Sequence, residues 1–111
     1  MTVVRLHDIL ATDLAGNGVH RTLTDGAGDL NVNLVHLDAG SEIAGHVNSE
    51  VDVLMIVLEG NGLLHVDDAS HEIVASSLAY VTQGRQRSIV AGPDGLTYLT
   101  AHRSRRPLSV T

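Results

Sequence analysis

Short clusters of glycine, asparagine and aspartate recur about every ten residues along this chain, and apolar segments lie between them. These residue types adopt the backbone conformations that tight turns require, so turns at this spacing are typical of short antiparallel strands. A chain interrupted this often has little room for long helices. The clearest clusters are LAGNGVH (14–20), DGAGD (25–29), EGNG (59–62), VDDAS (66–70) and AGPDG (91–95).

The segments between the turns carry strand patterns. LNVNLVHLD (30–38) alternates apolar and polar residues, as a strand with one buried face does. VDVLMIVL (51–58) is almost continuously apolar, as in a central strand that is covered on both faces. The single candidate for a helix is LHDILATDLAG (6–16). Together these segments predict about nine or ten short strands in an all-β sandwich or barrel.

Length and composition agree with one core made of strands. The 111 residues predict a single domain over 1–111. The hydrophobic share is 43%, but the chain has no Phe or Trp and only two Tyr. The core must therefore consist of aliphatic residues, which favours strands wherever the β-branched ones cluster.

Charge and composition also exclude several kinds of partner. The net charge of −6 provides no basic surface for nucleic acid, and two tyrosines provide few platforms for stacked bases. The absence of cysteine excludes disulfides and thiolate metal sites. The start, MTVVRLHDIL, is too short and too charged for a signal peptide, and no apolar run approaches the length of a membrane span. We therefore expect a cytoplasmic protein without nucleic-acid or membrane partners.

The stretch GHVNSEVDVLMIVLEG, with the glycine that precedes it, resembles the first sequence motif of the cupin superfamily, a group of small jelly-roll barrels. The family motif contains a glycine, two histidines, a glutamate and a second glycine. The matching residues here are Gly40, His46 and Gly60. Asn48 stands where the family has its second histidine, and Val53 stands where it has glutamate.

A second motif of the same family is similar to TQGRQR (82–87). Gly84 matches, Thr82 replaces the family's proline, and Arg87 stands at the position of a third histidine. The resemblance covers about residues 30–102 and implies a cupin-type jelly-roll β-barrel there. We expect N-terminal strands in 1–29 and a short Arg-rich C-terminal tail, 103–111.

The replaced residues argue against the usual metal site of the family. The resemblance implies three imidazoles and one carboxylate as metal ligands, and of these only His46 is present. Arg87 stays protonated and would repel a cation at the position of a ligand. We therefore predict no metal cofactor. The alternative is a divalent metal held by a different set of ligands: His46, Glu50, Asp52 and His102.

A pocket for a small, anionic organic molecule is the leading hypothesis. Arg87 would supply the positive charge, because a guanidinium suits carboxylates, phosphates and enolates. Val53, Met55 and Val57 would form an apolar wall. The predicted pocket consists of His46, Asn48, Val53, Met55, Arg87 and His102.

Three of these residues have a structural interpretation as well. His46 could be a structural histidine, and Asn48 could stabilise a turn through its own backbone. His102 shares one face of the segment LTYLTAHR with Tyr98 and Thr100, but it could equally be a surface residue.

Arg87 could instead form a salt bridge with Glu50 or Asp52 and fill the space of the metal. Which of these acids faces the barrel interior depends on whether the strand is continuous through SEVD. The sequence leaves that question open.

Two other functions stay open. The first is an enzyme, either a metal-dependent dioxygenase or isomerase that uses the alternative ligand set, or a metal-free isomerase. In the metal-free version His46 would be the general base and Arg87 would stabilise an enolate-like oxyanion. The second is a structural barrel that pairs with itself or with another protein. The resemblance implies a homodimer in either case.

Overall fold

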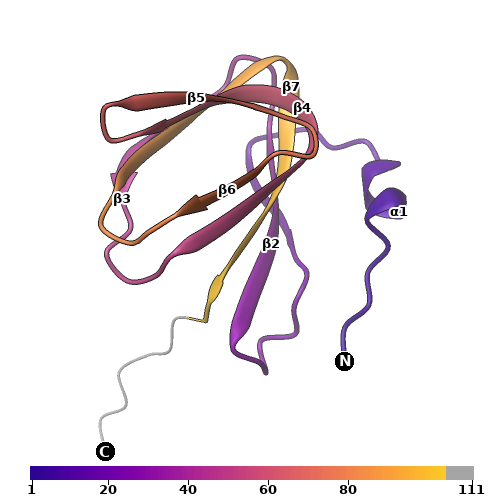
Figure 1. The fold of residues 1–111 in the computed structure, drawn as a ribbon. Helices are drawn as coiled ribbons and strands as arrows, with labels where there is room; N and C mark the ends of the chain where they lie inside the picture. The colour runs from indigo at the N-terminus through magenta and orange to yellow at the C-terminus, as the bar shows by residue number, and fades with distance from the viewer. Residues whose placement is uncertain (105–111) are drawn as a thin grey trace, which may run out of the picture.

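The computed structural model describes residues 1–104, and this part of the chain forms seven strands and one short helix (Figure 1). The elements are α1 (Leu6–Leu10), β1 (Gly18–Thr22), β2 (Leu30–Leu37), β3 (Glu42–Val47), β4 (Val53–Val66), β5 (Ala69–Val74), β6 (Leu78–Val81) and β7 (Gln86–Arg103). No helix in residues 1–104 is long and apolar enough to cross a membrane. Most of the predicted Arg-rich tail, from Arg105 onward, lies outside the described residues.

The strands form two antiparallel layers that share two long strands. One layer has the order β1-β2-β7-β4-β6, and the other has the order β3-β7-β4-β5. The two long strands, β4 and β7, pair with each other in both layers and bend from one layer into the other. These bends fold the sheet over itself into the barrel seen in Figure 1.

Glycines make the bends possible. Gly60 in β4 has φ +81, in the left-handed region that other residues rarely adopt. A Cβ atom at Gly60 would overlap the backbone carbonyl of Gly95 in β7, so the two strands approach more closely than a side chain allows. The predicted turns EGNG and AGPDG are therefore bends inside β4 and β7. For this reason residues 1–104 contain seven strands and not nine or ten.

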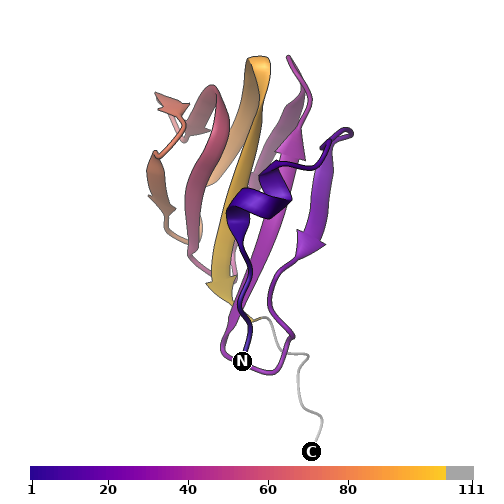
Figure 2. The ribbon, with the colours of Figure 1, turned by 90° about the vertical axis from the view of Figure 1, so that its right-hand side faces the viewer.

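The apolar core lies between the two layers. Its members point inward at every second position of the strands, and they include Val35, Leu37, Met55, Val57, Leu64, Ile73, Ile89, Leu96 and Tyr98. A smaller buried region lies on the outer face, where Ile9 of α1 and Leu34 of β2 are buried. Figure 2 shows α1 lying across this face of the sheet. Residues 1–29 thus contain one helix, inside the helix candidate 6–16, and one strand, β1.

Candidate functional site

A cavity of about 220 Å³ opens into the barrel between the layers. Its walls are mostly apolar, and its polar residues are His46, Arg87, Tyr98, Thr100 and His102; the apolar ones include Val35, Ile43, Val53, Met55, Leu64, Val81 and Ile89. Gly18 and Val19 of β1 also line it. Val19 and His46 are exposed, so they lie at the mouth. The structure therefore brings together every residue of the predicted pocket except Asn48.

Strand alternation and one bulge explain how these side chains converge. Tyr98, Thr100 and His102 face the cavity at every second position of β7. Ile43 and His46 both face it although they are three residues apart. The register of β3 against β7 shifts between these two residues, as expected when a β-bulge inserts one extra residue and reverses the alternation.

His46 and Arg87 are direct cross-strand partners in β3 and β7. Residues in such positions are close enough for their side chains to interact. Nε of Arg87 donates a hydrogen bond to Nε2 of His46 at 3.3 Å, and Nδ1 of His46 lies 3.2 Å from the carbonyl oxygen of Ala44. A carbonyl can only accept, so Nδ1 carries the proton and Nε2 carries the lone pair.

This contact bears on the predicted role of His46 as a general base. A base needs a lone pair that can reach the substrate proton. The lone pair of His46 accepts the hydrogen bond from Arg87 instead. In this structure His46 therefore positions the guanidinium, and the isomerase with His46 as its base stays a prediction.

Asn48 lies outside the cavity and stabilises a turn. Its Oδ1 atom accepts hydrogen bonds from the backbone N–H groups of Glu50 and Val51, at 3.1 and 3.2 Å. Asn48 therefore has the structural role that was the alternative to a place in the pocket, the stabilisation of a turn. Nδ2 of Asn48 is buried and has no hydrogen-bond partner among the described residues. Together with His46, Arg87 and Glu50, Asn48 lines a rim hollow of about 290 Å³ next to the cavity.

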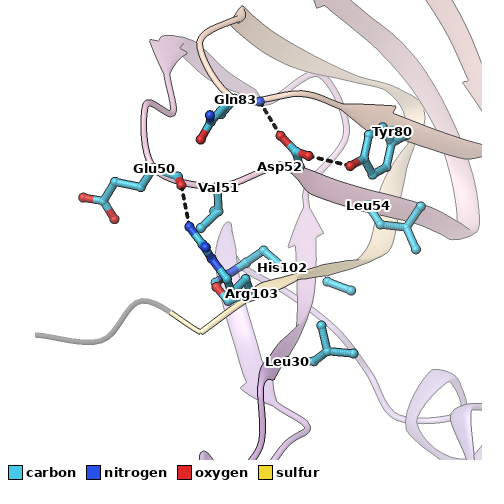
Figure 3. Close-up of a pocket in the computed structure, with 10 residues that line it drawn as sticks. Leu30, Glu50, Val51, Asp52, Leu54, Tyr80, Gln83, His102 and Arg103 are labelled. Carbon is cyan, nitrogen blue, oxygen red and sulfur yellow. Dashed lines mark hydrogen bonds between the residues drawn. The ribbon is translucent and has the colours of Figure 1, made fainter.

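Asp52 faces the outside of the barrel, which corrects its predicted pairing with Arg87. Its carboxylate accepts hydrogen bonds from the hydroxyl of Tyr80, at 2.5 Å, and from the backbone N–H of Gln83, at 2.8 Å (Figure 3). Val53, the next residue, faces inward, so Asp52 must face outward. Glu50 lines the same rim hollow as Arg87, so a pairing between these two stays a prediction.

The outward-facing residues border a shallow groove of about 530 Å³ on the outer face of the sheet (Figure 3). Leu30, Leu54 and Tyr80 form its apolar part. Arg103 crosses one end, and its Nη2 atom donates a hydrogen bond to the backbone carbonyl of Glu50 at 3.2 Å.

The alternative metal site is not assembled in this structure. Asp52 is held on the outer face by Tyr80 and Gln83, and the Nε2 lone pair of His46 is directed at Arg87. Within residues 1–104 no group of three or more His, Cys, Asp or Glu side chains is arranged to hold a metal ion. The structure therefore does not bring His46, Glu50, Asp52 and His102 together as one group, and metal binding itself stays untested.

Tyr98 and Thr100 are the polar cavity residues that the predicted pocket omits. Only 2% of the surface of Tyr98 is exposed, and this burial raises the pKa of Tyr98 to about 12, although the nearby charge of Arg87 acts in the opposite direction. Its hydroxyl therefore stays protonated and neutral at physiological pH. The alternation in LTYLTAHR already placed Tyr98 on the same face as His102, and that pattern was the available signal.

The contact between Tyr80 and Asp52 predicts a pH-dependent effect on stability. The hydrogen bond from the Tyr80 hydroxyl, followed by that from the Gln83 backbone, holds the pKa of Asp52 below its usual 3.8. A carboxyl whose pKa is lowered on folding stabilises the fold above its unfolded pKa, and that contribution is lost as the pH falls through the folded pKa. We expect Tyr80→Phe to lower the free energy of unfolding near neutral pH and to lose this effect as the pH falls below about 4.

Urea unfolding of both proteins between pH 7 and pH 2 measures this difference. Asp52→Asn provides the control, because in that background Tyr80→Phe should have an effect that does not vary with pH. A difference between wild type and Tyr80→Phe that is equally large at pH 7 and pH 2 would contradict the assignment.

Comparison with known proteins supports the fold. No protein-family profile matches the sequence, and no curated protein matches it. Among solved structures, a cupin-2 domain protein from Shewanella frigidimarina has a TM-score of 0.77 and 17% identity, covering 92% of this chain and 95% of its own. KdgF from Halomonas sp. has a TM-score of 0.71 and 15% identity, covering 78% and 77%. A predicted oxalate decarboxylase from Thermotoga maritima has a TM-score of 0.63 and 21% identity, covering 68% and 66%.

These similarities define the class of the protein. The chain has the cupin fold, an all-β jelly-roll barrel, and the resemblance drawn from its two motifs is confirmed at the level of the fold. At identities this low the solved structures show the fold alone. What the barrel binds must be argued from its own residues.

Proposed function

We propose that this cupin-fold protein binds a small, anionic organic molecule in its barrel, without the usual metal of the family. The observation that carries the proposal is a guanidinium, that of Arg87, in the wall of a small and mostly apolar cavity. Arg87 keeps its charge at any physiological pH. A fixed positive charge beside apolar walls attracts an anion more strongly than the same charge in water does.

His46 prepares Arg87 for this role. The hydrogen bond from Nε of Arg87 to His46 fixes the side chain through one of the five N–H groups of a guanidinium. A guanidinium held in one orientation loses less conformational entropy when it binds a carboxylate. His46 thus acts as a positioning residue, and Arg87 makes the contact with the anion.

The size and the walls of the cavity limit the rest of the ligand. A closed apolar cavity of about 150 Å³ accommodates benzene. The barrel cavity, at about 220 Å³, is somewhat larger and is open at its mouth. It suits a molecule of roughly six to ten non-hydrogen atoms with an anionic group at one end and an apolar body. Val53, Met55 and Ile89 would contact that body.

The rim hollow supports an anion at the same end of the cavity. Arg87 and His46 line both the cavity and the hollow. Asn48 lines the hollow as well.

Binding of simple carboxylates by wild type and Arg87→Gln tests the proposal. A ligand present at 100 times its Kd adds about 2.7 kcal/mol to the stability of the fold, which raises Tm by roughly 10 °C for a domain of this size. We expect branched aliphatic carboxylates of five or six carbons to raise Tm in the wild type and to have almost no effect on Arg87→Gln.

Arg85→Gln is the matched control, because it removes the same charge from an exposed arginine that pairs with Asp67 outside the cavity. This variant should respond to carboxylates as the wild type does. An equal response of Arg87→Gln, or no response of the wild type to any small carboxylate, would contradict the proposed function. The homodimer and the cytoplasmic location stay predictions.

A further inference from the structure

We propose that the ligand of the barrel is a small hydroxycarboxylic acid, whose carboxylate is bound by Arg87 and Tyr98 and whose hydroxyl is bound by His102. This inference rests on the proposed function and adds the chemical class of the ligand. It follows from the hydrogen-bonding capacity of two cavity residues. The Tyr98 hydroxyl can donate a hydrogen bond to an anion, and Nε2 of His102 can accept one from the ligand.

Tyr98 supplies the donor. Its side chain is almost fully buried in the cavity wall, and its hydroxyl makes no hydrogen bond within residues 1–104 that would use the donor. Arg87 and Tyr98 line the same cavity. Because the Tyr98 hydroxyl remains protonated at neutral pH, it can donate to an oxygen that Arg87 attracts. A carboxylate has two oxygens and can accept from both residues at once.

His102, which lines both the cavity and the outer groove, supplies the acceptor. Its Nδ1 atom lies 2.8 Å from the backbone carbonyl oxygen of Arg103, which can only accept, so Nδ1 carries the proton of the neutral ring. Nε2 therefore has a lone pair, and within residues 1–104 it has no hydrogen-bond partner. His102 thus differs from His46, whose Nε2 accepts from Arg87.

An acceptor in the cavity wall requires a donor on the ligand. A second positive charge, as in an amino acid, is disfavoured in an apolar cavity that already contains a guanidinium. A neutral hydroxyl satisfies Nε2 of His102 without that cost. The cavity therefore matches an acid with a hydroxyl on its chain rather than a plain fatty acid or an amino acid.

Calorimetric titration with matched acids tests this inference. The probes are 2-hydroxy-4-methylpentanoate, 3-hydroxy-4-methylpentanoate and 4-methylpentanoate, which lacks the hydroxyl. We expect the better of the two hydroxy acids to bind the wild type at least tenfold more tightly than 4-methylpentanoate. In His102→Leu the preference should fall below twofold. In Tyr98→Phe all three acids should bind about tenfold more weakly while the preference remains.

Thr100→Val is the matched control, because it removes a hydroxyl from the same face of β7 between the two residues. It should keep the preference for the hydroxy acid. Loss of the preference in Thr100→Val but not in His102→Leu would overturn the assignment to His102. If a variant does not fold, the wild type alone still tests the inference, through the ratio of its affinities for the better hydroxy acid and for 4-methylpentanoate.

The outcomes also separate this inference from the proposed function. If 4-methylpentanoate binds as tightly as both hydroxy acids, and its binding is lost in Arg87→Gln, the ligand class is wrong and the anion site stands. If none of the acids binds, the proposed function fails and this inference fails with it.

Discussion

Gly60→Ala is expected to lower the free energy of unfolding by about 3 kcal/mol, a large part of the stability of a small domain. Two costs combine at this position. Alanine at φ +81 is strained, and its Cβ atom would overlap the carbonyl oxygen of Gly95 on the neighbouring strand. Neither backbone can move without breaking the pairing between β4 and β7 at the bend. Urea denaturation of the purified variant measures the loss.

Gly26→Ala is the matched control, because it isolates the strain of the left-handed backbone conformation from the close approach of the strands. Gly26 has φ +82, almost the same as Gly60, but nothing lies within 4 Å of a Cβ atom built there. We expect it to cost about 1 kcal/mol, the strain of the left-handed conformation alone. Equal losses for the two variants would show that the close approach of β4 and β7 does not determine the stability of the bend.

Leu96→Ala is expected to cost about 3 kcal/mol, within the usual range for a buried leucine. Only 1% of Leu96 is exposed, and it belongs to the core directly after the bend of β7. Its removal leaves a cavity that the two layers cannot close, because the shared strands hold them together. The expected result is a lower midpoint in urea with an unchanged slope.

Leu78→Ala serves as the control, since Leu78 is 64% exposed on the edge strand β6. Substitutions at exposed positions of this kind usually change stability by no more than about 0.5 kcal/mol. A loss in Leu96→Ala as small as that in Leu78→Ala would place Leu96 outside the cooperative core.

The fold could be predicted because its signals are local. Turn-forming residues and apolar alternation indicate strands one segment at a time, and the motif around Gly60 adds the type of barrel. The number of strands could not be predicted, because EGNG has the composition of a turn and still continues the strand. Only the close approach of Gly60 to Gly95 distinguishes a bend from a break, and it depends on a partner 35 residues away along the chain (95 − 60).

The site could be predicted less completely. His46 and Arg87 stand at motif positions, and the structure places both in the cavity. The orientation of Asn48 and Asp52 depends on a bulge in β3 and on a turn, and both interrupt the alternation that a sequence pattern assumes. The direct contact between His46 and Arg87 depends on strand register. A residue list cannot supply that register.

The two edge strands at the cavity mouth have a consequence for how a ligand reaches the barrel. β1 pairs with β2 and β3 pairs with β7, and within residues 1–104 the two edges are not paired with each other, although both line the cavity. Passage of a molecule between these two edges would therefore break no hydrogen bond between strands. The walls built by β4 and β7 need not move. Rates of ligand association and release should thus depend on side chains at these two edges, while affinity depends on the residues of β7.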